Sequence, residues 1–268
     1  MMSAPSPKLT AIGSGKGGTG KTLVATGLAS ALAHEGERIL LCDADFGLSN
    51  TTVHLGLASG GDLAGVLGDR IALAEAVVPV CGGSGVRGGF DLIAAPAGSG
   101  TLANLDIDAT GRLAGKLRAS RAYDRILIDL SAGVDALTMV LAAHADETLL
   151  VLNADPAALT DAYAFAKVLL RLGGGIPKAI VNMAESASEG RRTADALAKT
   201  CRTFLKTAPD YMGSIPRDTH AAGAVRLQSP LTSLYPQSPS ALAITSLARQ
   251  MNEADRRTLS MTRSKTLR

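Results

Sequence analysis

The segment from Gly15 to Thr22 has the residue types and spacing of a loop that binds phosphate groups. In such loops, glycines let backbone N–H groups surround the β- and γ-phosphates, a lysine reaches the same phosphates, and a serine or threonine hydroxyl binds Mg²⁺. Lys21 and Thr22 stand in the last two positions, whereas Lys16 is a second lysine that an ordinary loop of this kind does not require. The residues predicted to bind nucleotide phosphates are Gly15, Gly17, Gly18, Thr19, Gly20, Lys21 and Thr22.

The residues on either side of this loop predict a strand that enters it and a helix that leaves it. Residues 8–12 have the pattern of a short buried strand, and apolar residues recur at helical spacing over 23–32. Gly36 stands where that helix is expected to end. A glycine-rich turn without function is the alternative, but the strand–loop–helix context favours a phosphate site.

Three carboxylates follow apolar strands and have the chemistry to handle Mg²⁺ and water. Asp43 and Asp45 end the second predicted strand two residues apart, so both are expected to project to the side of the phosphates. One can hold a Mg²⁺ water and the other can orient the water that attacks the phosphate. Asp129 ends the strand at 126–128, where a carboxylate supports Mg²⁺. Ordinary loop aspartates are the alternative; the predicted metal ligands are Thr22, Asp43 and Asp129.

Two more polar segments follow strands, and each has a functional and a structural interpretation. Asn182 ends the strand at 178–181, and its amide can both donate to and accept from the edge of adenine, although a lone Asn there also serves turns. Ser131–Gly133 could sense a γ-phosphate, or Ser131 or Asp135 could cap a helix. The four histidines show no metal-binding spacing.

Apolar strand runs alternate with helical patterns along the whole chain. Because the strand runs are continuously apolar, they are expected to be buried on both faces of a mostly parallel sheet. This alternation predicts an α/β fold with a doubly wound sheet flanked by helices, in which ligands bind beyond the carboxyl ends of the strands. The other predicted strands are 38–42, 90–94, 125–128, 148–152, 178–181 and 211–215, and clear helices are expected at 161–172 and 190–205.

Composition limits the classes of protein to which the chain can belong. Its 268 residues are expected to form one ATPase domain over 1–254, followed by a basic, flexible tail over 255–268. A net charge of +3 and an aromatic content of 3% without Trp argue against specific binding of nucleic acid. Three scattered cysteines, no signal peptide and no run of 18 apolar residues predict a cytoplasmic protein.

With these motifs the chain resembles the MinD/ParA-type ATPases with a deviant phosphate loop, and within them the FlhG (FleN/YlxH) branch. The resemblance covers about Thr10 to Ala248 and is most specific in four stretches, 43–57, 160–169, 181–190 and 215–239. It implies a P-loop ATPase that uses ATP/ADP and Mg²⁺, dimerises with ATP, hydrolyses it slowly and regulates flagellar number or placement. It further implies that Lys16 acts on the partner's nucleotide, that Asp45 positions the hydrolytic water with help from Asp43, and that Asn182, Pro216 and Asp218 frame adenine.

The partners implied by the resemblance are an FlhF-like GTPase, flagellar C-ring proteins, a flagellar transcription regulator and a second copy of the chain. Two departures from the family bear on these expectations. Family members often carry an N-terminal extension with a DQA-type motif that activates the GTPase, whereas only seven unpatterned residues precede the first strand here, so this activation is not expected. The segment 256–268 has five basic residues but few large apolar ones, which predicts weak membrane binding, at most peripheral at the inner membrane or cell pole.

Two other functions remain open from the sequence alone. One is a ParA-like partition ATPase that binds DNA, or another MinD-like positioning ATPase. The other is a metal- or cluster-handling relative, which would need paired cysteines that the chain does not have.

Overall fold

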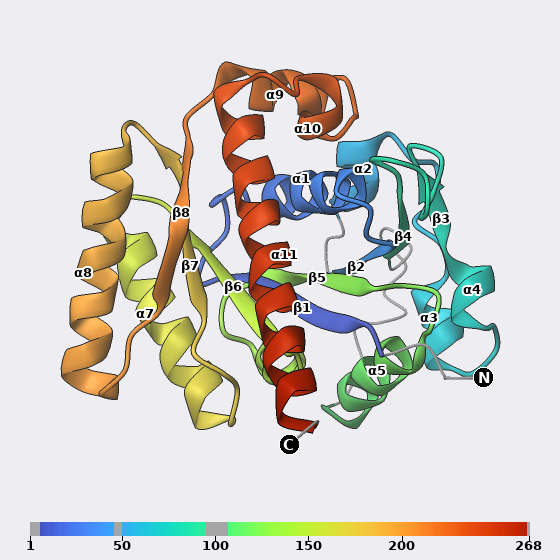
Figure 1. Ribbon diagram of the computed structural model, residues 1–268, viewed down its shortest axis with the longest axis horizontal. Helices are drawn as coiled ribbons and strands as arrows, with labels where there is room; N and C mark the ends of the chain where they lie inside the picture. The colour runs from blue at the N-terminus through green and yellow to red at the C-terminus, as the bar shows by residue number, and fades with distance from the viewer. Residues whose placement is uncertain (1–5, 46–49, 95–106, 267–268) are drawn as a thin grey trace.

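The computed structural model describes residues 6–45, 50–94 and 107–266, which form an eight-stranded sheet with helices on both faces (Figure 1). The strand order is β3-β4-β2-β5-β1-β6-β7-β8, and every neighbouring pair is parallel except β3 and β4. This confirms the predicted α/β class with a doubly wound, mostly parallel sheet. The strands are β1 (Lys8–Ser14), β2 (Ile39–Ala44), β3 (Val78–Val80), β4 (Phe90–Ala94), β5 (Arg125–Ala132), β6 (Glu147–Leu152), β7 (Lys178–Ala184) and β8 (Asp210–Pro216).

The strand that sequence patterns did not predict is β3. It has three residues, contains Pro79 and pairs antiparallel with β4 at the edge of the sheet. Proline cannot donate a hydrogen bond to a ladder and is confined to such edges, so β3 has neither the length nor the composition of a central strand. The other seven strands lie where apolar runs predicted them, with ends that differ by a few residues.

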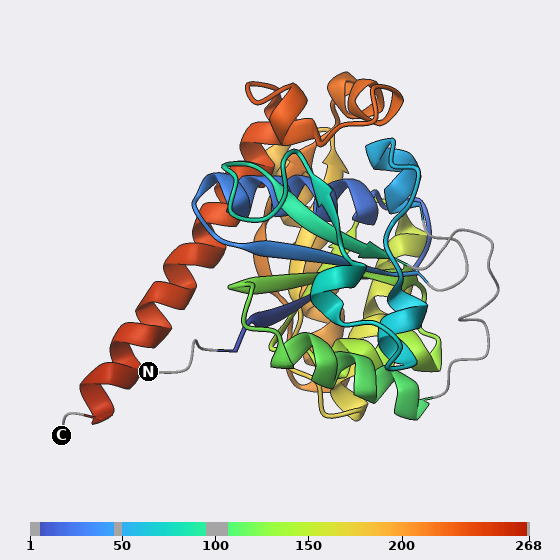
Figure 2. The ribbon, with the colours of Figure 1, turned by 90° about the vertical axis from the view of Figure 1, so that its right-hand side faces the viewer.

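Helices cover the two faces of the sheet in two groups. The core under the first face includes residues of α1, α2, α9, α10 and α11, and the core under the second includes residues of α3, α5, α6, α7 and α8. Figures 1 and 2 show this layering, with α1 and α11 on one side of the sheet and α5 on the other. The helices are α1 (Lys21–His34), α2 (Thr51–Leu55), α3 (Leu63–Leu67), α4 (Leu73–Ala76), α5 (Ile107–Ala119), α6 (Ala136–Ala143), α7 (Pro156–Arg171), α8 (Ala187–Leu205), α9 (Thr219–Arg226), α10 (Leu231–Leu234) and α11 (Pro239–Thr266).

Two helices begin earlier than their apolar periodicity suggested. Helix α7 starts at Pro156, because the Asp155 carboxylate accepts a hydrogen bond from the backbone N–H of Ala157 and proline is favourable at the first helical position. Helix α8 starts at Ala187, where the hydroxyl of Ser186 accepts from the backbone N–H of Glu189. Both corrections come from polar caps outside the apolar stripe.

The domain boundary expected at residue 254 falls inside α11. This helix continues to Thr266, so residues 255–266 are helical, while the single ATPase domain and the flexibility of its tail stay predictions. Within α11, the Asp255 carboxylate pairs with the Arg125 guanidinium at 2.5 Å and with the Lys8 ammonium at 2.5 Å. None of the described helices is long and apolar enough to cross a bilayer.

Asp255 belongs to a partly buried group of charges around the buried Arg125, which we call the Arg125 cluster: Arg125, Lys8, Lys178, Glu37, Glu147 and Asp255. The Arg125 side chain is only 2% exposed and pairs with Glu37 at 2.9 Å and with Glu147 at 3.0 Å. Burial raises the pKa of Glu147, but the neighbouring cations Lys8, Lys178 and Arg125 outweigh it and hold the pKa at about 2. The cluster lies where β1 and β5 begin, at the end of the sheet opposite the glycine-rich loop.

Candidate nucleotide-binding site

The glycine-rich loop joins the end of β1 to the start of α1, and its backbone conformation requires glycine. Gly18 and Gly20 have φ angles of 78° and 82°, in the left-handed region that other residues rarely adopt. Gly15 packs so closely on α7 that a Cβ there would lie 2.2 Å from the carbonyl oxygen of Asp161. No side chain caps α1, so its first N–H groups point into the loop, where an anion can bind them.

Lys21 and Asp129 form a buried ion pair at this end of the sheet. The Lys21 Nζ and Asp129 Oδ1 atoms are 2.6 Å apart, and the side chains are 9% and 2% exposed. Burial raises the pKa of Asp129 to about 6, with Lys21 opposing the shift and Asp43 adding to it. The Thr22 side chain also hydrogen-bonds to Asp129. Lys21, Thr22 and Asp129 therefore meet at this end of the sheet, and their predicted roles toward phosphate and Mg²⁺ stay predictions.

Asp43 and Asp129 are direct neighbours on β2 and β5, because they are partners in the register of these strands. The Asp43 carboxylate is 1% exposed and accepts hydrogen bonds from the backbone N–H groups of Asp45 at 2.9 Å and Thr51 at 3.3 Å. Two fixed carboxylates beside the Thr22 hydroxyl supply the oxygen ligands that Mg²⁺ prefers. The residues predicted as metal ligands therefore fit that ion in type and in placement.

Asp45 follows β2 and faces the end of β5. Its carboxylate lies 3.3 Å from the Ser131 Oγ, which donates to it and also lies 3.4 Å from the carbonyl oxygen of Ala44. The cap of α6 is Asp135, which accepts from the backbone N–H of Thr138, and not Ser131. Ser131 is thus available to the site, which settles the choice of helix cap that the sequence left open.

Asn182 contacts the glycine-rich loop itself, which the sequence did not indicate. Its side chain is buried, and its Nδ2 donates to the carbonyl oxygen of Thr19 at 2.8 Å. A Cβ on Gly20 would lie 2.3 Å from the same Nδ2. The amide therefore holds the loop backbone, and its role toward adenine stays a prediction.

Asp218 holds two helices, and Pro216 ends β8 nearby. The Asp218 carboxylate accepts from the backbone N–H of His220 at 2.9 Å, capping α9, and from the Ser240 Oγ at 2.7 Å. Burial raises the pKa of Asp218, but these hydrogen bonds outweigh it and hold the pKa well below its usual range. These contacts fix the carboxylate between α9 and α11, and its role in framing adenine, like that of Pro216, stays a prediction.

Lys16 is paired within its own chain. Its ammonium group contacts the carboxylate of Asp155, the residue that caps α7, and holds the pKa of that carboxyl below its usual range. Both side chains are partly exposed, at 28% and 45%. The sequence did not single out Asp155, although an Asp before a Pro at the start of a helix is a recognisable cap.

Residues 10–231 match the model of the CobQ/CobB/MinD/ParA nucleotide-binding domain. The chain belongs to this family. The glycine-rich loop, Asp43, Asp129 and Asn182 all lie within the matched residues, and their individual roles stay predictions.

Curated relatives share most of their length with the chain. It is 36% identical over 250 residues to "Antiactivator FleN" of Pseudomonas aeruginosa, covering 91% of this chain and 86% of the relative. It is 28% identical over 231 residues to "Flagellum site-determining protein YlxH" of Helicobacter pylori, covering 85% and 76%. Among solved structures, MinD of Pyrococcus horikoshii complexed with Mg-ADP superposes with a TM-score of 0.78, covering 93% of this chain and 97% of that one at 24% identity, which shows the shared fold.

Proposed function

We propose that this family member is an ATP-dependent dimerising switch that hydrolyses ATP slowly and regulates the number or placement of flagella. The observation that carries the switch is the meeting of Lys21, Asp43 and Asp129 beside the glycine-rich loop, with a second lysine, Lys16, standing outside this group. The flagellar role rests on the similarity to FleN and YlxH over most of the chain.

The residues divide the work of binding and hydrolysis. Lys21 would leave Asp129 for the β- and γ-phosphates, which carry more negative charge than one carboxylate. Thr22, Asp43 and Asp129 would hold Mg²⁺, which neutralises phosphate charge when bound. Asp45 would then orient the attacking water, beside the Ser131 hydroxyl that already donates to it.

Lys16 would act on the nucleotide of a second copy. It stands at the edge of the loop and is exposed enough to leave Asp155 without opening the core. Phosphate charge on a partner subunit would attract it more strongly than a half-exposed carboxylate does. ATP bound in this way favours the dimer, and hydrolysis ends it.

Three variants separate these steps. Lys21→Ala should lose ATP binding and stay monomeric, Lys16→Ala should keep much of its ATP affinity but neither dimerise nor hydrolyse, and Asp45→Ala should accumulate as a dimer with ATP. Light scattering with ATP and with ADP measures each outcome. If wild type and Asp45→Ala both stay monomeric with ATP at micromolar protein, the switch is wrong; if Lys16→Ala dimerises normally, that lysine is only part of the loop.

The flagellar role has its own test in the organism that encodes the chain. Replacing the gene with the Lys16→Ala form should change the number or position of flagella counted by electron microscopy. Unchanged flagella alongside an altered distribution of DNA would favour a ParA-like partition function instead, and a filter-binding assay with non-specific DNA would test that directly.

A further inference from the structure

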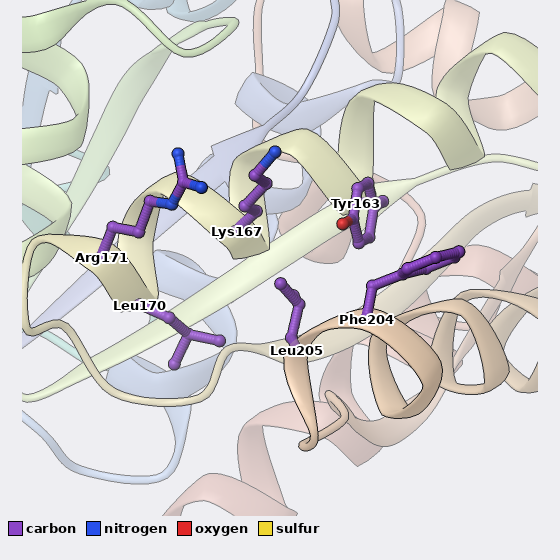
Figure 3. Close-up of a pocket in the computed structure, with 6 residues that line it drawn as sticks. All are labelled: Tyr163, Lys167, Leu170, Arg171, Phe204 and Leu205. Carbon is purple, nitrogen blue, oxygen red and sulfur yellow. The ribbon is translucent and has the colours of Figure 1, made fainter.

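Helices α7 and α8 lie side by side on one face of the sheet (Figure 1). Side chains of both helices line a hollow between them. The hollow has a volume of about 460 Å³ and is lined by Tyr163, Lys167, Leu170 and Arg171 of α7 and by Phe204 and Leu205 of α8 (Figure 3). We call it the α7–α8 groove. None of these residues belongs to the nucleotide-binding site.

The groove exposes apolar surface that the fold does not use. The Phe204 side chain is 67% exposed, and its ring meets Tyr163 edge to face with centroids 6.1 Å apart. Leu172, the residue after Arg171, is 48% exposed. A single exposed apolar residue is ordinary, but an aromatic pair at the mouth of a hollow is a typical anchor site for a partner.

Two basic side chains lie beside the apolar residues of the α7–α8 groove. Lys167 and Arg171 are four residues apart and lie along one wall of the groove (Figure 3). Across the described parts of the chain neither has a carboxylate partner. The segments 162–177 and 196–209 contain no Asp or Glu, while the second adds Lys199, Arg202 and Lys206.

From these observations we propose that the α7–α8 groove binds an acidic amphipathic helix of another protein. Two packed helices present ridges and a groove into which a third helix fits, with apolar side chains on one face seated against Tyr163, Leu170 and Phe204. Its Asp or Glu side chains pair with Lys167 and Arg171. Nucleic acid fits the groove less well. Protein surfaces that bind nucleic acid are polar and strongly basic, whereas four of the six residues that line this groove are apolar or aromatic. This proposal does not depend on the nucleotide switch, since the groove and the site share no residue.

The test uses the full-length protein and a displayed library of random peptides of about 16 residues, enough for a helix of about 24 Å. Peptides selected on the wild type should be acidic, with apolar residues spaced three or four apart. A labelled copy of one selected peptide should bind the Lys167→Glu/Arg171→Glu variant at least about tenfold more weakly, and Phe204→Ser likewise. The matched control is Arg87→Glu/Arg112→Glu, which reverses two exposed cations away from the groove and should leave the affinity unchanged within about twofold.

Each other result counts against the proposal. Basic or neutral peptides, no selected peptide, or binding that ignores the groove variants would overturn it. Oligo-dT and vesicles with anionic phospholipid are tested in parallel. If either binds and the binding needs Lys167 and Arg171, the occupant of the groove is nucleic acid or membrane, and the proposed helix is wrong. Nucleotide binding by the groove variants, measured in the same samples, should equal that of the wild type, so that failure here is distinct from failure of the switch.

Discussion

Removing the Asn182 amide tests how the glycine-rich loop is held. In Asn182→Ala, the carbonyl of Thr19 loses its donor at 2.8 Å, and both residues are buried, at 3% and 2% exposed. A hydrogen bond contributes about 1 kcal/mol net, and a buried carbonyl left without a partner raises the cost to about 1–3 kcal/mol. The free energy of unfolding should fall by that amount.

The same loss should appear in nucleotide binding. The Asn182 amide also packs against Gly20, so its removal leaves the loop less ordered before the nucleotide binds. The nucleotide must then order the loop, which makes the free energy of binding less favourable. A cost of about 1–3 kcal/mol corresponds to an affinity for ATP or ADP that is roughly 5- to 150-fold weaker. We expect GTP to bind more weakly than ATP in the wild type.

Urea unfolding and calorimetric titration with Mg²⁺ and each nucleotide measure both effects. The control is Asn153→Ala, which removes a partly exposed amide with only a 3.4 Å contact to the backbone N–H of Asp155 and should cost less than about 1 kcal/mol. If Asn182→Ala unfolds and binds nucleotide like the wild type, the amide does not hold the loop. GTP binding as tight as ATP binding would contradict the assignment of the site to adenine.

Three more predictions follow from named contacts. The Arg125 cluster lowers the pKa of Glu147 to about 2, so the ionised Glu147 carboxylate stabilises the fold fully above its ordinary pKa of 4.5, and this stabilisation is lost as the pH falls through about 2. Glu147→Gln should therefore lower the free energy of unfolding by about 3 kcal/mol at pH 7, measured with urea, and by less at pH 3. An equal loss at the two pH values would contradict this. Gly15→Ala should destabilise the fold by about 1–3 kcal/mol and weaken nucleotide binding, because the added Cβ would meet the α7 backbone. Gly17→Ala should change thermal stability little, because open space surrounds that position. If Gly17→Ala were the less stable of the two variants, the loop would pack differently. Asp155→Asn should keep the cap of α7 but release Lys16, giving more dimer with ATP by light scattering, and less dimer would show that Asp155 assists the dimer instead.

Local sequence patterns sufficed for seven of the eight described strands and for the polar residues at the ends of the central ones. β4 was predicted at 90–94 without change, and Asp43 and Asp129, both predicted as metal ligands at strand ends, are register partners on β2 and β5. Residues 46–49, part of a stretch that carried the family resemblance, lie outside the described residues. The prediction is therefore strongest where chemistry is tied to a strand end.

Contacts between distant segments were beyond the sequence. The Asn182 side chain binds a carbonyl 163 residues away, and Asp218 binds Ser240 22 residues away. Each depends on how strands and helices pack, not on the residues beside it. The start of α7 was missed for a different reason: Asp155 is a polar cap, whereas apolar periodicity marks only the buried face of a helix.

The Arg125 cluster joins the first strand of the sheet to the last helix of the chain. Lys8 lies in the central strand β1 and pairs directly with Asp255 of α11, 247 residues later. Asp255 also pairs with Arg125, which begins β5. If the end of α11 unfolds locally, the buried Arg125 guanidinium loses Asp255, one of the three carboxylates that pair with it in the described structure, and becomes exposed to water. Local unfolding of α11 is thereby coupled to the centre of the sheet. The backbone amides around Asp255 should therefore exchange their hydrogens slowly, like those of β1, and not at the fast rate of a disordered chain end.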